Sequence, residues 1–147
     1  MFRMLLTLLG LVFIVNVSAQ DIHSPQALAN AITAAIAKGD RASLAKLFSP
    51  DTNADSEKFA IQDFMAYEGA AHLSARPIRP DDKDWVGVPL PVLLKKQAEH
   101  GYAFPTKPLG RIMVSGQKSG QNHISMAGAF YGKLDNKYLL IFAKRTK

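Results

Sequence analysis

The side chains best placed for chemistry lie on one face of the strands predicted near the end of the chain. In the predicted register His123 lies beside Ser115, with Ser125, Tyr131 and Arg111 along the same face. A histidine next to a hydroxyl can transfer a proton, and an arginine can hold a carboxylate or a phosphate. These five residues are therefore the candidate ligand-binding set. For His123 itself we favour the plainer interpretation, an exposed strand histidine that is hydrogen-bonded to water.

Recognisable catalytic motifs are missing from the sequence. It contains no cysteine, no GxSxG nucleophile motif and no glycine-rich phosphate loop. None of the histidines has the spacing of a known metal-binding motif. Glu68 and His72 share a helix face only if that helix extends far enough, and two ligands do not complete a zinc site. We therefore expect no catalytic residue, no metal and no cofactor.

The residues that must position this face begin with a helical corner. Ser24 and Pro25 are typical of a helix start, because a serine oxygen caps free N–H groups and proline has a preset φ. Gly39 is expected to end this first helix. Asp40 is expected to cap a second, shorter helix that ends at Pro50.

A third helix is predicted over residues 56–67, with a continuation through Gly69 toward Leu73. A fourth is predicted over residues 91–100. Between them, Trp85 follows an acidic turn. It belongs either to the core, which we favour, or to an exposed recognition loop.

The end of the chain has the pattern of a β-meander. Strands are predicted over residues 109–117, 122–134 and 137–144. A three-residue loop with Gly120 and a two-residue Asp-Asn turn at 135–136 join them. The resulting register pairs apolar residues on one face: Val114 with Ile124, Ile112 with Met126, and Phe130 with Ile141. We expect this face to pack against the helices.

The predicted fold class is therefore α+β, with N-terminal helices packed on a C-terminal antiparallel β-meander. The run of residues 37–51, AKGDRASLAKLFSPD, together with this element order, resembles the nuclear-transport-factor-2-like superfamily, which includes SnoaL-like and ketosteroid-isomerase-like proteins. The resemblance implies a cone-shaped α+β barrel. It leaves function open, because that fold supports enzymes, ligand carriers and interaction modules. No catalytic signature of the isomerase or cyclase members is recognisable.

The first 19 residues have the pattern of a removable secretory signal. Arg3 precedes an apolar run of about a dozen residues, and Val17 and Ala19 occupy the −3 and −1 positions of a cleavage site. The alternative is an uncleaved anchor, but the run is shorter than the roughly 20 residues that cross a bilayer. We expect one domain, residues 20–147, in the periplasm or secreted, and no integral membrane protein after cleavage.

The charge of this expected mature chain is lopsided. Residues 20–90 contain seven Lys and Arg against ten Asp and Glu, whereas residues 91–147 contain ten against two. Either the acidic charge of the first half balances the basic charge of the second within one domain, or the second half forms a basic face that attracts an anionic partner. The candidate basic patch consists of Lys95, Lys96, Lys144, Arg145 and Lys147.

Candidate partners of this patch are an anionic surface, such as phospholipid headgroups, and an acidic protein. Nucleic acid is not expected, because no aromatic residues are interleaved with the basic ones to stack on bases.

Three functions follow from the sequence. The first, which we favour, is an exported non-enzymatic binding domain that holds a partner or an apolar small molecule on its basic sheet half or in a cavity. The second is an isomerase- or cyclase-like enzyme with a pocket between sheet and helices. The third is an interaction protein that works as a homodimer. Its outer sheet face would leave four large side chains exposed: Met113, Tyr138, Leu140 and Phe142.

Overall fold

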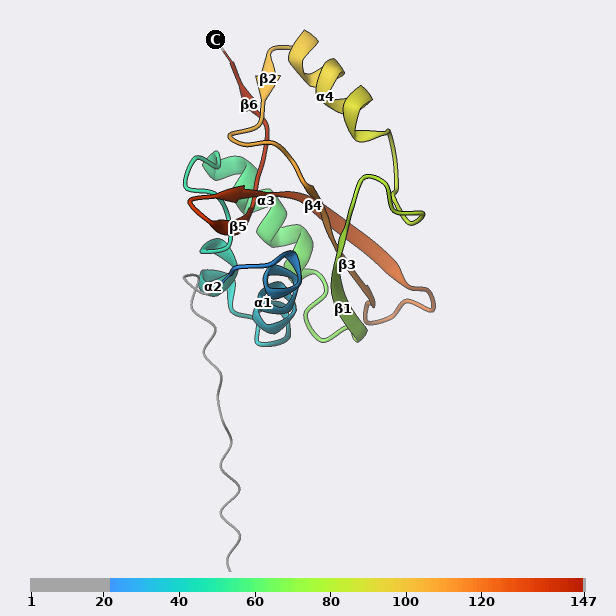
Figure 1. The fold of residues 1–147 in the computed structure, drawn as a ribbon. Coiled ribbons are helices and arrows are strands. Elements are labelled where there is room, and N and C mark those ends of the chain that lie inside the picture. The colour runs from blue at the N-terminus through green and yellow to red at the C-terminus, as the bar shows by residue number, and fades with distance from the viewer. Residues whose placement is uncertain (1–21, 147) are drawn as a thin grey trace, which may run out of the picture.

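The computed structural model describes residues 22–146. The predicted signal and Lys147 lie outside these residues. The fold is α+β: three helices come first, and a curled antiparallel sheet follows (Figure 1). A fourth helix comes after the first strand of that sheet in the chain. This confirms the expected fold class. Between residues 22 and 146, no helix combines the length and apolar character needed to span a membrane.

The first helix begins and ends where local chemistry predicts. α1 spans Pro25–Ala37, and Ser24 Oγ accepts a hydrogen bond from Ala27 N at 3.0 Å at its start. Gly39 then adopts a left-handed φ of 64°, which an L side chain rarely adopts and which ends the helix. These two residues confirm the predicted limits of the helix.

The next two helices are also capped by polar side chains. Asp40 caps α2, Arg41–Ala45, by accepting hydrogen bonds from Ser43 N at 3.0 Å and from Ser43 Oγ at 2.6 Å. These hydrogen bonds stabilise the ionised carboxylate, so they hold the pKa of Asp40 below its ordinary value. Asn53 caps α3, Ala54–Met65. The helical corner is thus specified almost entirely by neighbouring residues.

The segment after α3 is a strand, which corrects the predicted helical continuation toward Leu73. Gly69 and His72 have φ values of 72° and 57°, and neither value is compatible with an α-helix. β1, Ala71–Ile78, instead pairs antiparallel with β3, Gly110–Gln117, which satisfies its backbone groups. The sheet therefore has one more strand than the predicted meander.

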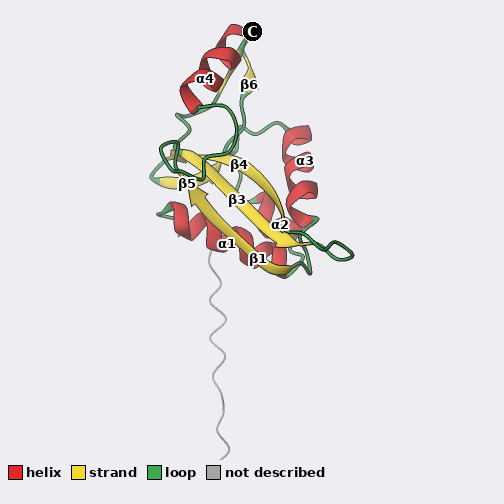
Figure 2. Ribbon diagram, turned by 90° about the vertical axis from the view of Figure 1, so that its right-hand side faces the viewer, coloured by secondary structure: helices red, strands yellow, loops and turns green. Residues whose placement is uncertain are grey.

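The main sheet has the strand order β1-β3-β4-β5 and curls into a half-barrel (Figure 2). β4 spans Ser125–Leu134, β5 spans Lys137–Leu140, and the turn at residues 135–136 joins them with positive φ at both positions. The predicted register of this hairpin is confirmed, since Ile141 N donates to Phe130 O at 2.9 Å.

The predicted register between β3 and β4 was wrong: the observed pairing is shifted from it by three residues. Val114 pairs with Ala127 and not with Ile124, because the loop between the strands spans residues 118–124 and is longer than the three residues expected. A shift by an odd number of residues moves every side chain of the strand to the other face. Tyr131 therefore lies on the buried face and Phe130 on the outer face.

The core lies between the inner face of the sheet and the first three helices. α1 contacts β1, β3 and β5. Apolar side chains from both layers are fully buried there, among them Leu28, Ile32, Ile36, Ile112 and Val114. The loop after α2 is tied to β5, because Ser49 N donates to Leu140 O and Leu140 N donates to Leu47 O, both at 2.8 Å. This core fixes the sheet whose outer face carries the site.

The remaining elements form what we call the α4 arm. It consists of α4, Leu90–Glu99, and a small sheet of β2, Tyr102–Ala103, with β6, Lys144–Arg145. Thr146 closes it, because its N and Oγ1 both donate to Gly101 O, at 2.6 and 2.8 Å. The arm projects beyond one end of the main sheet (Figures 1 and 2). The predicted fourth helix is confirmed.

Candidate functional site

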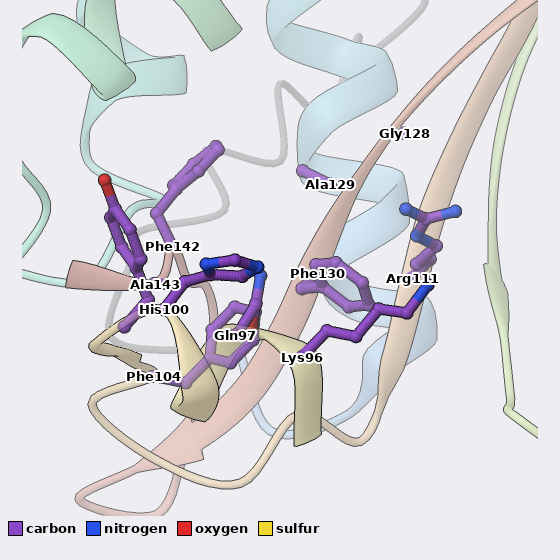
Figure 3. A pocket seen from close by; sticks show the side chains of 11 residues that line it. Lys96, Gln97, His100, Phe104, Arg111, Gly128, Ala129, Phe130, Phe142 and Ala143 are labelled. Carbon is purple, nitrogen blue, oxygen red and sulfur yellow. The ribbon is translucent and has the colours of Figure 1, made fainter. Parts of the chain in front are cut away.

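A pocket of about 570 Å³ lies between the α4 arm and the outer face of the sheet (Figure 3). Pockets that hold small organic molecules have volumes of roughly 300–1,000 Å³ and mostly apolar walls. Four aromatic side chains line this one: Tyr102, Phe104, Phe130 and Phe142. Four polar side chains join them: Lys96, Gln97, His100 and Arg111. The pocket thus combines an aromatic wall with a few polar side chains, one from the sheet and three from the arm.

Arg111 is the central polar residue of the pocket. It extends from β3 on the outer face, with its Cζ atom 4.6 Å from the centre of the Phe130 ring and 5.5 Å from that of Trp85. Its Nη1 donates to Val86 O at 2.9 Å, whereas its Nε is buried and donates to no acceptor in the described chain. Partial burial disfavours the charged form and lowers the pKa of the guanidinium.

The loop before α4 contacts the Arg111 side chain on the outer face of the sheet, through the Val86 carbonyl and the Trp85 ring. Trp85 is half-buried, its ring lies 6.4 Å from that of Phe130, and its Nε1 donates to Val88 O at 3.1 Å. It belongs neither to the core, as we expected, nor to a free recognition loop. Trp85 instead covers the guanidinium and orders the loop around it.

The helix of the arm supplies the polar residues of the opposite wall. Lys96 and His100 are exposed on α4, and the Lys96 side chain runs toward the side of the pocket that holds Arg111 (Figure 3). Gln97 lies between them, and its Oε1 is buried with no hydrogen-bond partner among residues 22–146. Two atoms of the lining residues, the donor Nε of Arg111 and the acceptor Oε1 of Gln97, are therefore buried without a partner among residues 22–146.

The structure separates three members of the predicted ligand-binding set from Arg111: His123, Ser125 and Tyr131. Ser115 remains on the same face of β3 as Arg111, four residues further along the strand. His123 is exposed in the loop between β3 and β4, away from Ser115, which pairs with Met126. Ser125 begins β4, with a buried Oγ that has no described partner. Tyr131 is buried on the inner face, where burial raises the pKa of its phenol. The mistaken register explains why these three residues had been placed on the face of Arg111, because a shift of three residues exchanges the two faces of β4.

The predicted basic patch is located on the α4 arm. Lys95 and Lys96 are exposed on α4, and Lys144 and Arg145 are exposed on β6, which pairs with β2. Lys147 lies outside the described residues. The arm therefore brings together charges that lie almost fifty residues apart in the sequence.

The apolar face expected for a homodimer is largely internal. Met113 and Leu140 are buried within the single chain, and Tyr138 and Phe142 pack against the core. Near the start of β4, in contrast, Ile124 and Met126 are exposed, at 63% and 58%. Burial thus removes the specific face that the dimer prediction named.

Sequence reasoning missed most of the pocket. It did not select Gln97 or His100 as site residues, nor the aromatic wall that contains Phe104 and Phe130. A signal for Phe130 was present, since it is a large apolar residue directly opposite Arg111 once the register is correct. The residues of the arm carry no such local signal.

No protein-family model, no curated protein and no solved structure matches the chain. The site must therefore be interpreted from its own geometry. Among residues 22–146 there is no cluster of three or more His, Asp or Glu able to hold a metal ion. What the arrangement offers is apolar contact, cation–π stacking and a few convergent hydrogen-bonding groups.

Proposed function

We propose that the chain is a non-enzymatic binding domain that holds an apolar small molecule between the α4 arm and the sheet. The observation that carries this proposal is the pocket of about 570 Å³ with four aromatic side chains in its wall. Burial of aromatic and aliphatic ligand surface in such a pocket is a main source of affinity. The side chains of Arg111 and Gln97, which line the pocket, supply the few polar groups that orient a ligand.

The sequence supports a place for this activity in the periplasm or outside the cell. Residues 1–19 have the pattern of a secretory signal, and the basic charge of the C-terminal half suits an anionic surface near the site of action. The resemblance of residues 37–51 to the nuclear-transport-factor-2-like superfamily also supports binding, because that superfamily includes ligand carriers.

An isomerase- or cyclase-like enzyme is the alternative. Such an enzyme needs a positioned acid or base in the pocket. His100 is a pocket-lining candidate, but it is exposed, and no hydrogen bond from the described residues orients its ring. Arg111 keeps its proton at any ordinary pH and cannot act as a base. The geometry therefore favours binding over catalysis.

Titration with a neutral, environment-sensitive dye such as Nile red tests the proposal. We expect saturable binding at one site per chain, and at least about a tenfold loss of affinity in Ala143→Trp, which fills the pocket with an indole. Ala34→Trp, on the exposed side of α1, is the matched control and should bind like the wild type. Equal binding by both variants, or no binding by the wild type, would reject a function in this pocket.

A further inference from the structure

We infer that the pocket takes an organic anion, with an apolar body against the aromatic wall and a carboxylate against the Arg111 guanidinium. This inference rests on the proposed function and names the class of its ligand. It depends on the charges of the pocket, on its polar side chains and on its aromatic wall.

The positive charge of Arg111 is not compensated within the described chain. Its only hydrogen bond is to a neutral carbonyl, that of Val86, and no carboxylate of residues 22–146 lies within ion-pair distance. A partly buried charge without a counter-charge is unfavourable, because it loses hydration, and the neutral carbonyl and the aromatic rings around it offset only part of that loss. A ligand carboxylate that enters the pocket would supply that partner.

A second arginine on this face of the sheet does have a carboxylate partner. On the same face of the sheet, Arg76 is paired with Asp84, with 2.9 Å between Nη1 and Oδ2. Asp82 accepts a hydrogen bond from the Arg79 backbone N at 2.7 Å. The acidic turn of residues 81–84 therefore supplies a counter-charge to Arg76 and none to Arg111, which lies beneath Trp85.

The other polar groups of the pocket also suit an anion. Lys96 and His100 line it, and none of its described lining residues is acidic. Basic groups on one pocket raise the local concentration of anions and speed their association. Gln97 also lines the pocket, and its amide can donate a hydrogen bond to an anion as well as accept one.

The remaining wall fixes the rest of the ligand. The rings of Phe104 and Phe130 meet edge to face with their centroids 5.3 Å apart, and together they present an apolar surface beside Arg111. Such a surface accepts a flat ring or an alkyl chain and gives no partner to further polar groups. One guanidinium and one apolar wall match a molecule with a single acid group at one end.

Matched pairs of acids and neutral analogues test the inference. Binding of 2-naphthoate is compared with that of 2-naphthamide, and binding of decanoate with that of decanol, by calorimetry at low and high salt. We expect the acid of at least one pair to bind at least about tenfold more tightly than its neutral analogue, because hydrogen bonds to a charged group are stronger. Adding 2-naphthyl phosphate distinguishes a carboxylate site from a phosphate site.

Substitution of Arg111 locates the acid group. Arg111→Met should lower affinity for the preferred acid about tenfold and leave affinity for its neutral analogue within about twofold. Arg41→Met, an exposed change on α2, lowers the net charge equally and should leave both affinities unchanged. Arg111→Met also removes the hydrogen bond to the Val86 carbonyl and so changes the loop before α4. Lys96→Met therefore serves as a second variant. Its side chain is exposed, and we expect a several-fold loss for the acid alone.

The outcomes separate this inference from the function on which it rests. If acids and neutral analogues bind equally, or if neither Arg111→Met nor Lys96→Met changes the preference, the anionic ligand is wrong and the apolar pocket stands. Tighter binding of the phosphate than of the carboxylate also overturns the carboxylate. If Nile red and all five naphthyl and decyl compounds fail to bind, the proposed function fails first.

Discussion

The rings of Phe48 and Phe142 stack with their centroids 5.9 Å apart and an angle of 16° between their planes. Phe48 belongs to the core and is 5% exposed, whereas Phe142 lines the pocket. This contact joins the packing of the core to the wall of the candidate site. A change to the core residue is therefore expected to affect both stability and binding.

Phe48→Ala should lower the free energy of unfolding by about 3–5 kcal/mol, because it removes a buried ring and leaves a cavity. It should also weaken binding of any pocket ligand, since Phe142 loses its stacking partner. Urea unfolding gives the first quantity and calorimetry the second. Phe59→Ala is the control: Phe59 is 71% exposed, and its loss should cost less than about 0.5 kcal/mol. Equal costs for the two variants would contradict this placement of Phe48.

Trp85 should report occupation of the pocket through its fluorescence. It is the single tryptophan of the sequence, and its ring lies 5.5 Å from Arg111 Cζ. A ligand that contacts the guanidinium changes the charge and solvent around the indole, so saturation should shift the emission. Trp85→Phe should abolish the signal while calorimetry still detects binding. A ligand that saturates by calorimetry without any change in emission would show that it binds elsewhere.

Gly110→Ala should destabilise the junction of β1, β3 and β4. An added methyl group would run into the Ile78 carbonyl oxygen and the Tyr131 ring, and overpacking of this kind costs about 1–3 kcal/mol. The midpoint of urea unfolding measures the loss. Ser74→Ala, an exposed change on β1, should move that midpoint little. A tolerated Gly110→Ala would mean that the strands pack less closely than described.

Asp40→Ala should destabilise the protein in a way that depends on pH. The folded state holds the pKa of Asp40 below its ordinary value of 3.8, so the ionised cap stabilises the fold above that pH and loses its effect as pH falls through the folded-state pKa. The melting temperatures of wild type and variant should therefore differ at about pH 7 and converge in acid. Asp40→Asn keeps a capping oxygen and should show a smaller difference at pH 7. A difference that is the same at all pH values would rule out a role for the charge.

The sequence predicted those elements whose limits depend on neighbouring residues. Ser24, Gly39 and Asp40 specify the helical corner by capping and a left-handed glycine, and both effects act within a few residues. The β4–β5 register was also predictable, because a two-residue turn with positive φ at both positions leaves a single pairing. In each case local chemistry was enough.

The remaining errors arise where distant parts of the chain decide the outcome. The loop before β4 has no signal that fixes its length, and the choice between Ala127 and Ile124 as partner of Val114 depends on which side chain the core accepts. For the segment that contains His72, pairing with β3 overrides the helical pattern. Arg111 was found from its type and position, but the pocket around it needs the α4 arm, whose place no local pattern encodes.

The hydrogen bonds from Thr146 to Gly101 join residues that lie 45 positions apart in the sequence. β3, β4 and β5 lie between β2 and β6 in the chain, so the loop that the arm closes contains most of the main sheet. Phe142 and Ala143, which line the pocket, lie between the last strand of that sheet and β6. The segment that leaves the core and the segment that closes the arm are therefore continuous, and the candidate site is held at both ends.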